Sequence, residues 1–267
     1  MKKTAVLLFV LLLNAGYVFA FGIDNPKIYV HLHQDEIYTD KILVTNTTQA
    51  PLEVRAYYQD FEYTEPFNGE KNFYPPDSLD FSIGSWLTLT PNVFHLEPGE
   101  SQVAYITIQP NEPFDRVHCG VIFFETAMGM GMNEDGSQVQ TLGRIGSIVF
   151  VEPAGKENKQ LKCDVDSSLP YTIDLNVFNA GNSFIHTVPS YYVIDEDGNF
   201  YDRGSLDETF FMPGDSTRVS GNITKNISPG HYIMVLTIDM EEGAVIVPEI
   251  SFSIDSSGFI NISKVTQ

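Results

Sequence analysis

The sequence is poor in cysteine, tryptophan and basic residues. It holds two Cys and one Trp in 267 residues, and 15 Lys and Arg stand against 35 Asp and Glu, which gives a net charge of −20. An acidic surface of this strength repels phosphate backbones and anionic lipid headgroups. Nucleic acid is therefore excluded as a partner, and the charge favours solubility and basic protein partners.

After residue 20 the sequence also lacks an apolar run long enough to cross a membrane as a helix. Residues 1–20 combine two lysines, an apolar stretch at 5–13 and the small-x-Ala ending VFA, which is the pattern of a cleaved signal peptide. The apolar stretch is too short to span a bilayer, no Cys follows Ala20, and the tail at 255–267 is polar. We expect an exported protein without membrane insertion, located in the periplasm, with the cell surface or the medium as the alternative.

Motifs of the common enzyme classes are missing as well. The chain has no Gly-x-Ser-x-Gly, no His-Glu-x-x-His and no glycine loop that would hold a phosphate. His118 and Cys119 are neighbours, but consecutive residues of a strand point to opposite faces and cannot act as base and nucleophile. The sequence predicts a protein that is not an enzyme and needs no cofactor.

What the chain does contain is strand patterns. Within 86–125, apolar and polar residues alternate in the runs LTLT and FHL, and the turn Pro98-Gly99 leads into an alternating strand at 101–108. Residues 121–124 (VIFF) are apolar on both faces, as expected of a strand at the centre of a sandwich. No stretch of the mature chain has helical periodicity beyond a turn or two. The chain is therefore predicted to be all-β.

The second half repeats this order of parts. The turn MPGDS at 212–216 echoes EPGES at 97–101, and each leads into an alternating strand and then an apolar one. Short strands with turns about every ten residues, twice over, are typical of tandem immunoglobulin-like β-sandwiches. Residues 61–80, rich in aromatics and Pro, are expected to form a long surface loop. The predicted boundaries are a signal peptide at 1–20, a first sandwich at 21–153, a linker at 154–160, a second sandwich at 161–257 and a polar tail at 258–267.

The two cysteines allow one disulfide in an exported chain. A bridge between Cys119, in the apolar strand, and Cys163, just after the linker, would tie the two domains together. Two buried thiols without a bridge are the alternative, and the sequence leaves both open.

Residues 27–153 resemble the N-terminal domain of periplasmic pilus chaperones, the PapD-like family. The resemblance rests on the runs SWLTLTP, FHLEPGESQVAYITIQP, CGVIFFE and RIGSIVFVEP. They follow the family's order of a Pro after a strand, a Leu-x-Pro-Gly turn, an alternating strand, a long loop and a last strand ending in aromatic-x-x-Pro. A second sandwich of suitable size follows, as in that family.

This resemblance implies capture of pilin-like or other surface protein subunits by donation of the last strand of the first domain. In strand addition, main-chain hydrogen bonds give affinity and alternate side chains fill pockets. The family also clamps the terminal carboxylate of the subunit between two cations. The positions that carry these roles here are the donor edge at 139–151, with Val139, Leu142, Ile145 and Ile148 on it, and Lys27 and Arg144 as the cations.

A second resemblance gives the alternative function. The run PNEPFDRVHCGVIFFE, followed by a second sandwich with MPGDS, is similar to two-domain cell-surface proteins of Gram-positive bacteria that bind WxL proteins and peptidoglycan. Those proteins usually end in a transmembrane anchor, for which this sequence has no candidate. The alternative is a structural or adhesive protein of the cell envelope that binds surface proteins or peptidoglycan without chaperone activity.

The segment before the predicted donor strand is rich in Met and Gly. Met128, Met130 and Met132 would lie on one side of an extended loop, and His31 and His33 on one face of a strand. Thioethers suit Cu(I), whereas Met side chains that cover an apolar partner surface are the simpler interpretation. The sequence therefore assigns no metal. The run NEDG at 133–136 predicts a turn.

Overall fold

The computed structural model describes residues 21–267 apart from 134, 225–226, 242–244 and 267. The signal peptide predicted at 1–20 lies outside the described residues. Within them the chain is built from strands, and the one helix is the short 3-10 turn η1 (Gly84–Trp86). In this part of the chain no helix has the length and apolar character needed to cross a membrane. The prediction of an all-β protein is confirmed.

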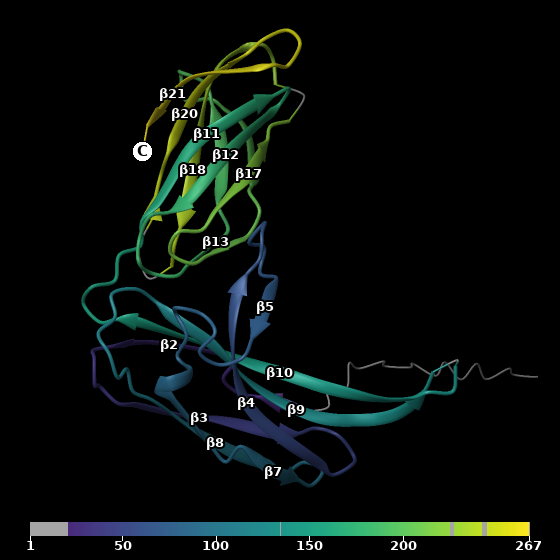
Figure 1. Ribbon diagram of the computed structural model, residues 1–267. Coiled ribbons are helices and arrows are strands. Elements are labelled where there is room, and N and C mark those ends of the chain that lie inside the picture. The colour runs from purple at the N-terminus through teal and green to yellow at the C-terminus, as the bar shows by residue number, and fades with distance from the viewer. Residues whose placement is uncertain (1–20, 134, 225–226, 242–244, 267) are drawn as a thin grey trace, which may run out of the picture.

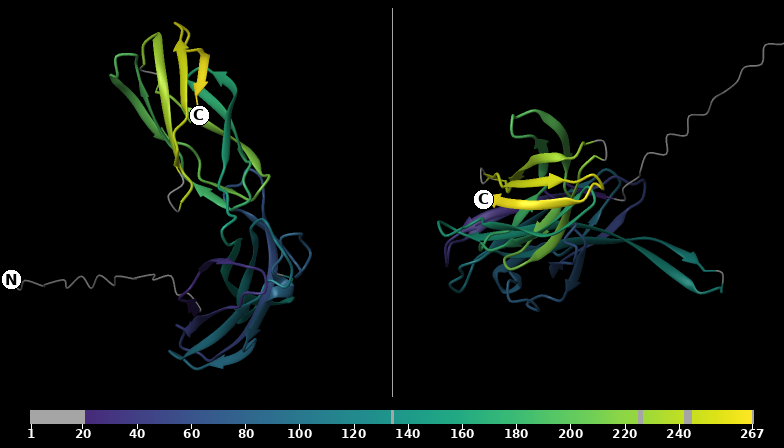
Figure 2. Two further views of the ribbon diagram at one scale, coloured as in Figure 1. Left: turned by 90° about the vertical axis from the view of Figure 1, so that its left-hand side faces the viewer. Right: turned by 90° about the horizontal axis from the view of Figure 1, so that it is seen from above.

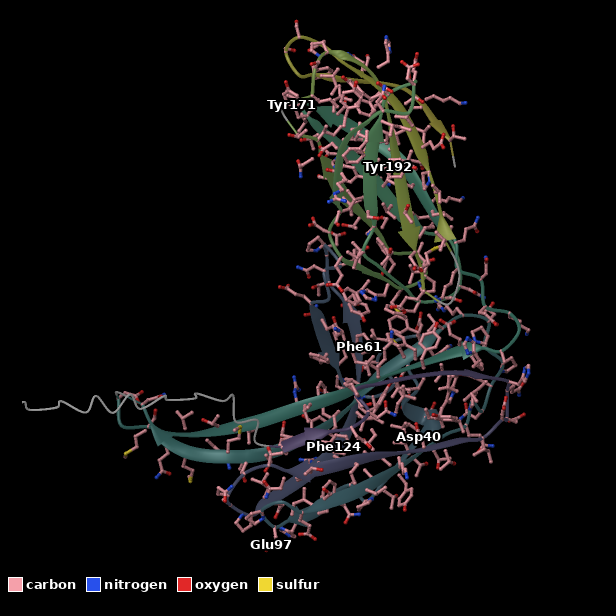
Figure 3. All side chains as sticks on the ribbon, turned by 180° about the vertical axis from the view of Figure 1, so that it is seen from behind. Asp40, Phe61, Glu97, Phe124, Tyr171 and Tyr192 are labelled. Carbon is pink, nitrogen blue, oxygen red and sulfur yellow. The ribbon has the colours of Figure 1, made fainter. Side chains whose placement is uncertain are left out.

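The first half folds into two facing sheets. Its strands are β1 (Phe21–Ile23), β2 (Lys27–Leu32), β3 (Tyr38–Asn46), β4 (Leu52–Tyr63), β5 (Lys71–Tyr74), β6 (Leu87–Thr90), β7 (Val93–Leu96), β8 (Ser101–Ile108), β9 (His118–Met132) and β10 (Gln138–Pro153). One sheet has the order β1-β3-β8-β6 and the other β2-β10-β9-β4-β5, with β7 paired to β4. The sheets enclose an apolar core that includes Phe124 (Figure 3). β2 and β10 pair in parallel.

β9 is buried on both faces over residues 118–124. Ile122 and Phe124 belong to the core between the two sheets, whereas Val121 and Phe123 belong to a second apolar cluster on the side of the other domain. The strand lies between β10 and β4, at the middle of its sheet. The sequence predicted this central position, which explains why the run VIFF is apolar on both faces and does not alternate.

The second half forms the second sandwich, stacked above the first in Figure 1. Its strands are β11 (Leu161–Leu169), β12 (Thr172–Asn179), β13 (Ile185–Thr187), β14 (Ser190–Ile194), β15 (Phe200–Ser205), β16 (Thr209–Phe211), β17 (Ser216–Asn222), β18 (Gly230–Asp239), β19 (Val245–Ile246), β20 (Glu249–Ile254) and β21 (Ile260–Thr266). A sheet β11-β12-β17 faces a sheet β15-β14-β18-β20-β21 across a separate core. The tandem sandwich architecture is thus as predicted.

The polar tail predicted at 258–267 is wrong. Most of it forms β21, which pairs with β20 along its whole length. Ile260 is fully buried and Ile262 packs against the core, while the other side chains of the strand are mostly exposed. An edge strand with so few apolar residues gives a weak alternating pattern, which explains the error.

The surface loop predicted at 61–80 is wrong in part, because 61–63 and 71–74 are strand while 64–70 and 75–80 lie outside strands. β4 continues to Tyr63 and forms a hairpin with β5 that reaches the second domain (Figure 1). Phe61 and Phe67 are buried, and the backbone N–H of Phe210 in the second domain donates to the carbonyl of Phe67 at 2.8 Å. The aromatic side chains that suggested an irregular loop fill the contact between the domains.

That contact is an apolar cluster contributed by both sandwiches. Phe61 (Figure 3), Tyr63 and Phe150 from the first domain meet Phe184 and Met212 from the second. The rings of Phe150 and Phe184 stack at 4.2 Å between centroids. Because the cluster buries aromatic side chains of both domains against one another, it stabilises the contact between them.

Each domain contains a turn of the same kind, built around a buried Asn side chain. In the first, the side-chain amide of Asn46 donates to the carbonyls of Ala50 (2.8 Å) and Leu96 (3.0 Å). In the second, the amide of Asn179 donates to the carbonyls of Ser183 (2.9 Å) and Phe211 (3.3 Å).

Each Asn also joins its turn to the Pro-Gly turn of its own domain. The carbonyl of Asn46 accepts from Gly99 N, and that of Asn179 accepts from Gly214 N, both at 3.0 Å. The repeat seen between EPGES and MPGDS therefore extends to matching hydrogen bonds around a fully buried Asn.

Asn46→Ala and Asn179→Ala should destabilise their own domains by similar amounts. Each change leaves buried carbonyls without a donor, a loss of about 1–3 kcal/mol in the free energy of unfolding. Urea denaturation measures the loss, with Asn111→Ala at an exposed site as the control. A loss no larger than that of the control would contradict the role assigned to these side chains.

Two carboxyl groups near the domain contact have raised pKa values. Oε1 of Glu152, which is fully buried, accepts from the hydroxyl of Tyr29 (2.8 Å) and from Phe184 N (3.0 Å), and burial raises the pKa of Glu152. Burial also raises the pKa of Asp215 to about 6, although Met212 N donates to it at 2.8 Å. For both groups the folded state favours the proton.

Stability should therefore fall as pH rises through about 6, the pKa of Asp215 in the folded protein. A carboxyl group whose pKa is higher in the folded than in the unfolded protein contributes its full stabilisation below its unfolded-state pKa. That contribution is lost as the pH rises through its folded-state pKa. We expect E152Q/D215N to flatten the dependence of the unfolding free energy on pH between 4 and 7.5. The exposed pair E97Q/D80N is the control for general charge repulsion. Equal slopes in the two variants would refute the assignment.

Candidate binding edge

A long hairpin of β9 and β10 projects from the first sandwich, away from both domains (Figures 1 and 2). Its tip is closed by Asn133 N, which donates to the carbonyl of Ser137 at 2.9 Å, and by the carboxylate of Asp135, which accepts from Ser137 N at 2.9 Å. Gly136 adopts a φ of +78°, which favours glycine. Gly136 N donates to the carbonyl of Asn133 at 2.9 Å, as expected of the turn predicted at 133–136, of which residue 134 lies outside the described residues. The Met-Gly segment before it is strand and not loop.

β10 has a free outer edge over more than half of its length. Its inner edge pairs with β9 from Gln138 to Val151, whereas its outer edge pairs with β2 only from Ile148 to Pro153. No strand in the described part of the chain pairs with the outer edge at 138–146. At about 3.3 Å per residue, this stretch offers roughly 30 Å of unpaired backbone.

The start of β2 ends this free edge. Ile148 N donates to the carbonyl of Pro26 at 2.9 Å, and Oγ of Ser147 donates to the carbonyl of Asn25 at 2.7 Å. The predicted donor edge at 139–151 is therefore too long, because its last residues already pair within the protein.

The residues assigned to the donor strand do not form one row. Ile145 packs against the core of the first sandwich, and Ile148 packs against the cluster between the domains. Side chains three residues apart on a strand point to opposite faces. By the same alternation Val139 shares the face of Ile145, and Leu142 shares the face of Ile148.

The outer half of the hairpin exposes apolar side chains. The exposed fractions are 50% for Met128, 71% for Met130, 76% for Met132, 38% for Val139 and 53% for Leu142. Such a cluster on a projecting element is typical of an interaction surface.

The sequence predicted that the three methionines lie on one side, and this prediction is wrong. Met130 and Met132 pair across from Gln140 and Gln138, which places them on the face of Leu142. Met128 is the extra residue at a register shift. A Cβ added to Gly143 would lie 2.5 Å from the Met128 sulfur, so Met128 covers the opposite face.

Arg144 lies on an aromatic surface at the base of the hairpin. Its guanidinium is 3.9 Å from the centroid of Phe123 and 5.1 Å from that of Phe73, and it donates to the Gln59 side chain at 3.3 Å. A Cβ on Gly146 would come within 3.0 Å of the Phe123 ring, so this glycine lets Phe123 lie against β10. Arg144 is thus an exposed, oriented cation beside the free edge.

Lys27 is engaged between the domains. Its Nζ is 3.7 Å from a carboxylate oxygen of Glu241 and 5.7 Å from the centroid of Phe184, both in the second domain. Glu241 also contacts His186, whose Nδ1 is 2.9 Å away. Because Lys27 and Glu241 are each about half exposed, with side-chain exposures of 43% and 47%, the pair contributes little stability.

Lys27 and Arg144 are not brought together as a clamp. Lys27 pairs across from Ile148, and Arg144 precedes Ile148 by about 13 Å along the strand. The sequence also missed the side chains that orient the two cations, namely Phe73, Phe123 and Gln59 for Arg144 and Phe184 and Glu241 for Lys27. The aromatic residues were visible in the sequence, but their partners lie far away along the chain.

The structure does not support the disulfide or the copper site. Cys119 and Cys163 are both buried and no disulfide joins them; they belong to different apolar clusters. His31 pairs across from Glu152, whereas Met130 pairs across from Gln140, which places them about 40 Å apart along β10. The described residues contain no group of three His, Cys, Asp or Glu that could hold a metal ion.

No family profile and no curated protein matches this chain in sequence. Among solved structures, the chain is similar to the class 5 fimbriae chaperone CfaA, with a TM-score of 0.53 and 13% identity over 85% of this chain and 97% of that chain. It is also similar to a chain of a chaperone–tip adhesin complex of CFA/I fimbriae biogenesis, with a TM-score of 0.50 and 14% identity over 85% and 96%. The chain therefore has the two-domain β-sandwich fold of the pilus chaperones, as its sequence resemblance to the PapD-like family predicted.

Proposed function

We propose that this protein is a periplasmic, chaperone-like protein that captures protein subunits of the cell surface by strand addition to β10. The observation that carries the proposal is the free outer edge at 138–146, where unpaired main-chain groups lie beside exposed apolar side chains. An extended segment of a partner would complete the ladder and cover those side chains.

The composition of this edge supports a binding role. Unpaired strand edges are normally protected by charge, proline or short length. Residues 138–143 (QVQTLG) contain neither a charge nor a proline. The edge strand β6 is uncharged but has only four residues, and β15 and β21 carry charged side chains. Among these edges, residues 138–143 of β10 form the longest stretch without a charge or a proline.

The pairing of β2 supports one direction for the captured segment. β2 runs parallel to β10 and occupies the same outer edge. A segment that runs parallel in line with β2 would end beside Pro26 and Lys27, so its terminal carboxylate would approach the Lys27 ammonium. Arg144 would contact a residue of the captured segment that precedes its terminal carboxylate. We assign the two cations to successive positions of the captured segment and not to one carboxylate.

Solved chaperones with this fold supply the context. One similar structure is a chaperone–tip adhesin complex, which makes a surface subunit the natural class of partner. The expected signal peptide agrees with a location outside the cytoplasm. A non-enzymatic role also agrees with the absence of catalytic motifs in the sequence.

The double variant V139D/L142D should abolish capture and leave the fold intact, because both side chains are exposed and the added charges oppose an apolar contact. The measurement is co-purification of subunits with the mature protein from its native envelope, identified by mass spectrometry. V93D/V188D, at sites with exposures of 51% and 54%, is the matched control. Ile145→Asp is a poorer test because Ile145 packs against the core.

Capture that survives V139D/L142D, with circular dichroism unchanged, would reject strand addition at this edge. Retention of cell-wall glycan in place of protein subunits would favour the adhesive alternative.

Arg144→Gln should weaken subunit binding about 10- to 100-fold, since a hydrogen bond to a charged group contributes roughly 1.5–3 kcal/mol. The loss should shrink at high salt, because the contact is exposed. Affinity is measured by surface plasmon resonance on the subunit identified above, with Lys41→Gln as the control. An unchanged affinity would remove Arg144 from the binding edge.

A further inference from the structure

The methionines fall into two classes by exposure. Met128, Met130 and Met132, all on the outer hairpin, are exposed by 50%, 71% and 76%. Met212, Met234 and Met240 are exposed by 5%, 0% and 2% and belong to the apolar clusters. The exposed thioethers are thus confined to one element of the described chain.

We propose that the outer hairpin is a reversible oxidation site, at which peroxide converts Met128, Met130 and Met132 to sulfoxides and switches off capture at β10. The oxidation site is inferred only from the difference in exposure between the two classes of methionine. Its effect on capture rests on the proposed function.

The reaction is a two-electron oxygen transfer. The thioether sulfur donates an electron pair to a peroxide oxygen, an S–O bond forms, the O–O bond breaks, and the peroxide is reduced to water. A dithiol reductase reverses the step: the sulfoxide oxygen leaves as water and the two thiols become a disulfide. Access of the oxidant to the sulfur sets the rate, so the buried methionines should react later.

Oxidation at these positions changes the surface without disturbing the core. None of the three side chains belongs to an apolar cluster. A sulfoxide is polar, so it removes the apolar character that Met130 and Met132 share with Leu142 on one face. On the other face, an oxygen added to Met128 would crowd Gly143, where the sulfur already lies close to the backbone.

Selective oxidation is tested on the mature protein by limited hydrogen peroxide treatment and peptide mass spectrometry. We expect one added oxygen at each of the three hairpin methionines while Met212, Met234 and Met240 remain reduced, with unchanged circular dichroism. Equal oxidation of both classes, or unfolding that accompanies it, would overturn the proposal.

The effect on capture is tested in parallel with two variants. Peroxide should lower capture by the wild type about tenfold and leave M128L/M130L/M132L unaffected, because Leu keeps the apolar surface but cannot be oxidised. M130Q/M132Q should mimic the oxidised protein, and methionine sulfoxide reductase should restore the wild type.

The two proposals fail separately. Capture by the oxidised wild type that equals capture by the untreated protein would overturn the switch and leave strand addition standing. If the untreated protein captures nothing, strand addition fails, and the mass-spectrometric test still decides the oxidation site.

Discussion

The proposed function of this protein depends on the pairing of β2 with only the last part of β10. Because β2 begins at Lys27, opposite Ile148, it completes the sheet close to the second domain and leaves the outer edge open at 138–146. Ile148 N and Ser147 Oγ bind the segment just before β2, so the boundary between paired and unpaired backbone is sharp. One strand thus serves as a structural element at one end and as an available edge at the other.

The contact between the domains lies at the paired end of β10, away from the free edge. The aromatic cluster around Phe61, Phe150 and Phe184 locks the second sandwich over the paired end of β10. The hairpin points away from that contact (Figure 2). A captured segment would meet Arg144, which lies on the ring of Phe123 beside this edge. A side chain that is already oriented lowers the entropy cost of binding.

The sequence predicted much of the fold because strand periodicity is local. The alternating runs, the two Pro-Gly turns and the apolar run VIFF lie where they were expected, and the repeat extends to Asn46 and Asn179. Features that depend on distant partners were missed. The segment 61–80 was predicted to be a loop because its aromatic side chains contact residues of the second domain, which the local pattern does not show. β21 was predicted to be a tail because only Ile260 and Ile262 of this strand face the core.

The binding site remains a proposal, and the sequence anticipated only part of the geometry of the candidate edge, for the same reason. Its location on the last strand of the first domain followed from the family resemblance, but register decides which residues can act. Ile145 and Ile148 fall on opposite faces, and the bulge at Met128 separates it from Met130. Lys27 and Arg144 carry the right charge, yet β-sheet pairing sets them apart along β10. A pattern of residue types does not contain that pairing.

Amide hydrogen exchange along β10 tests the central claim most directly. In the free protein, the account predicts rapid exchange for the outward-facing amides of 138–146 and slow exchange for 148–152, with protection spreading over the first stretch once a subunit is bound. Protection of 138–146 in the free protein, or no change in that stretch on binding, would contradict it.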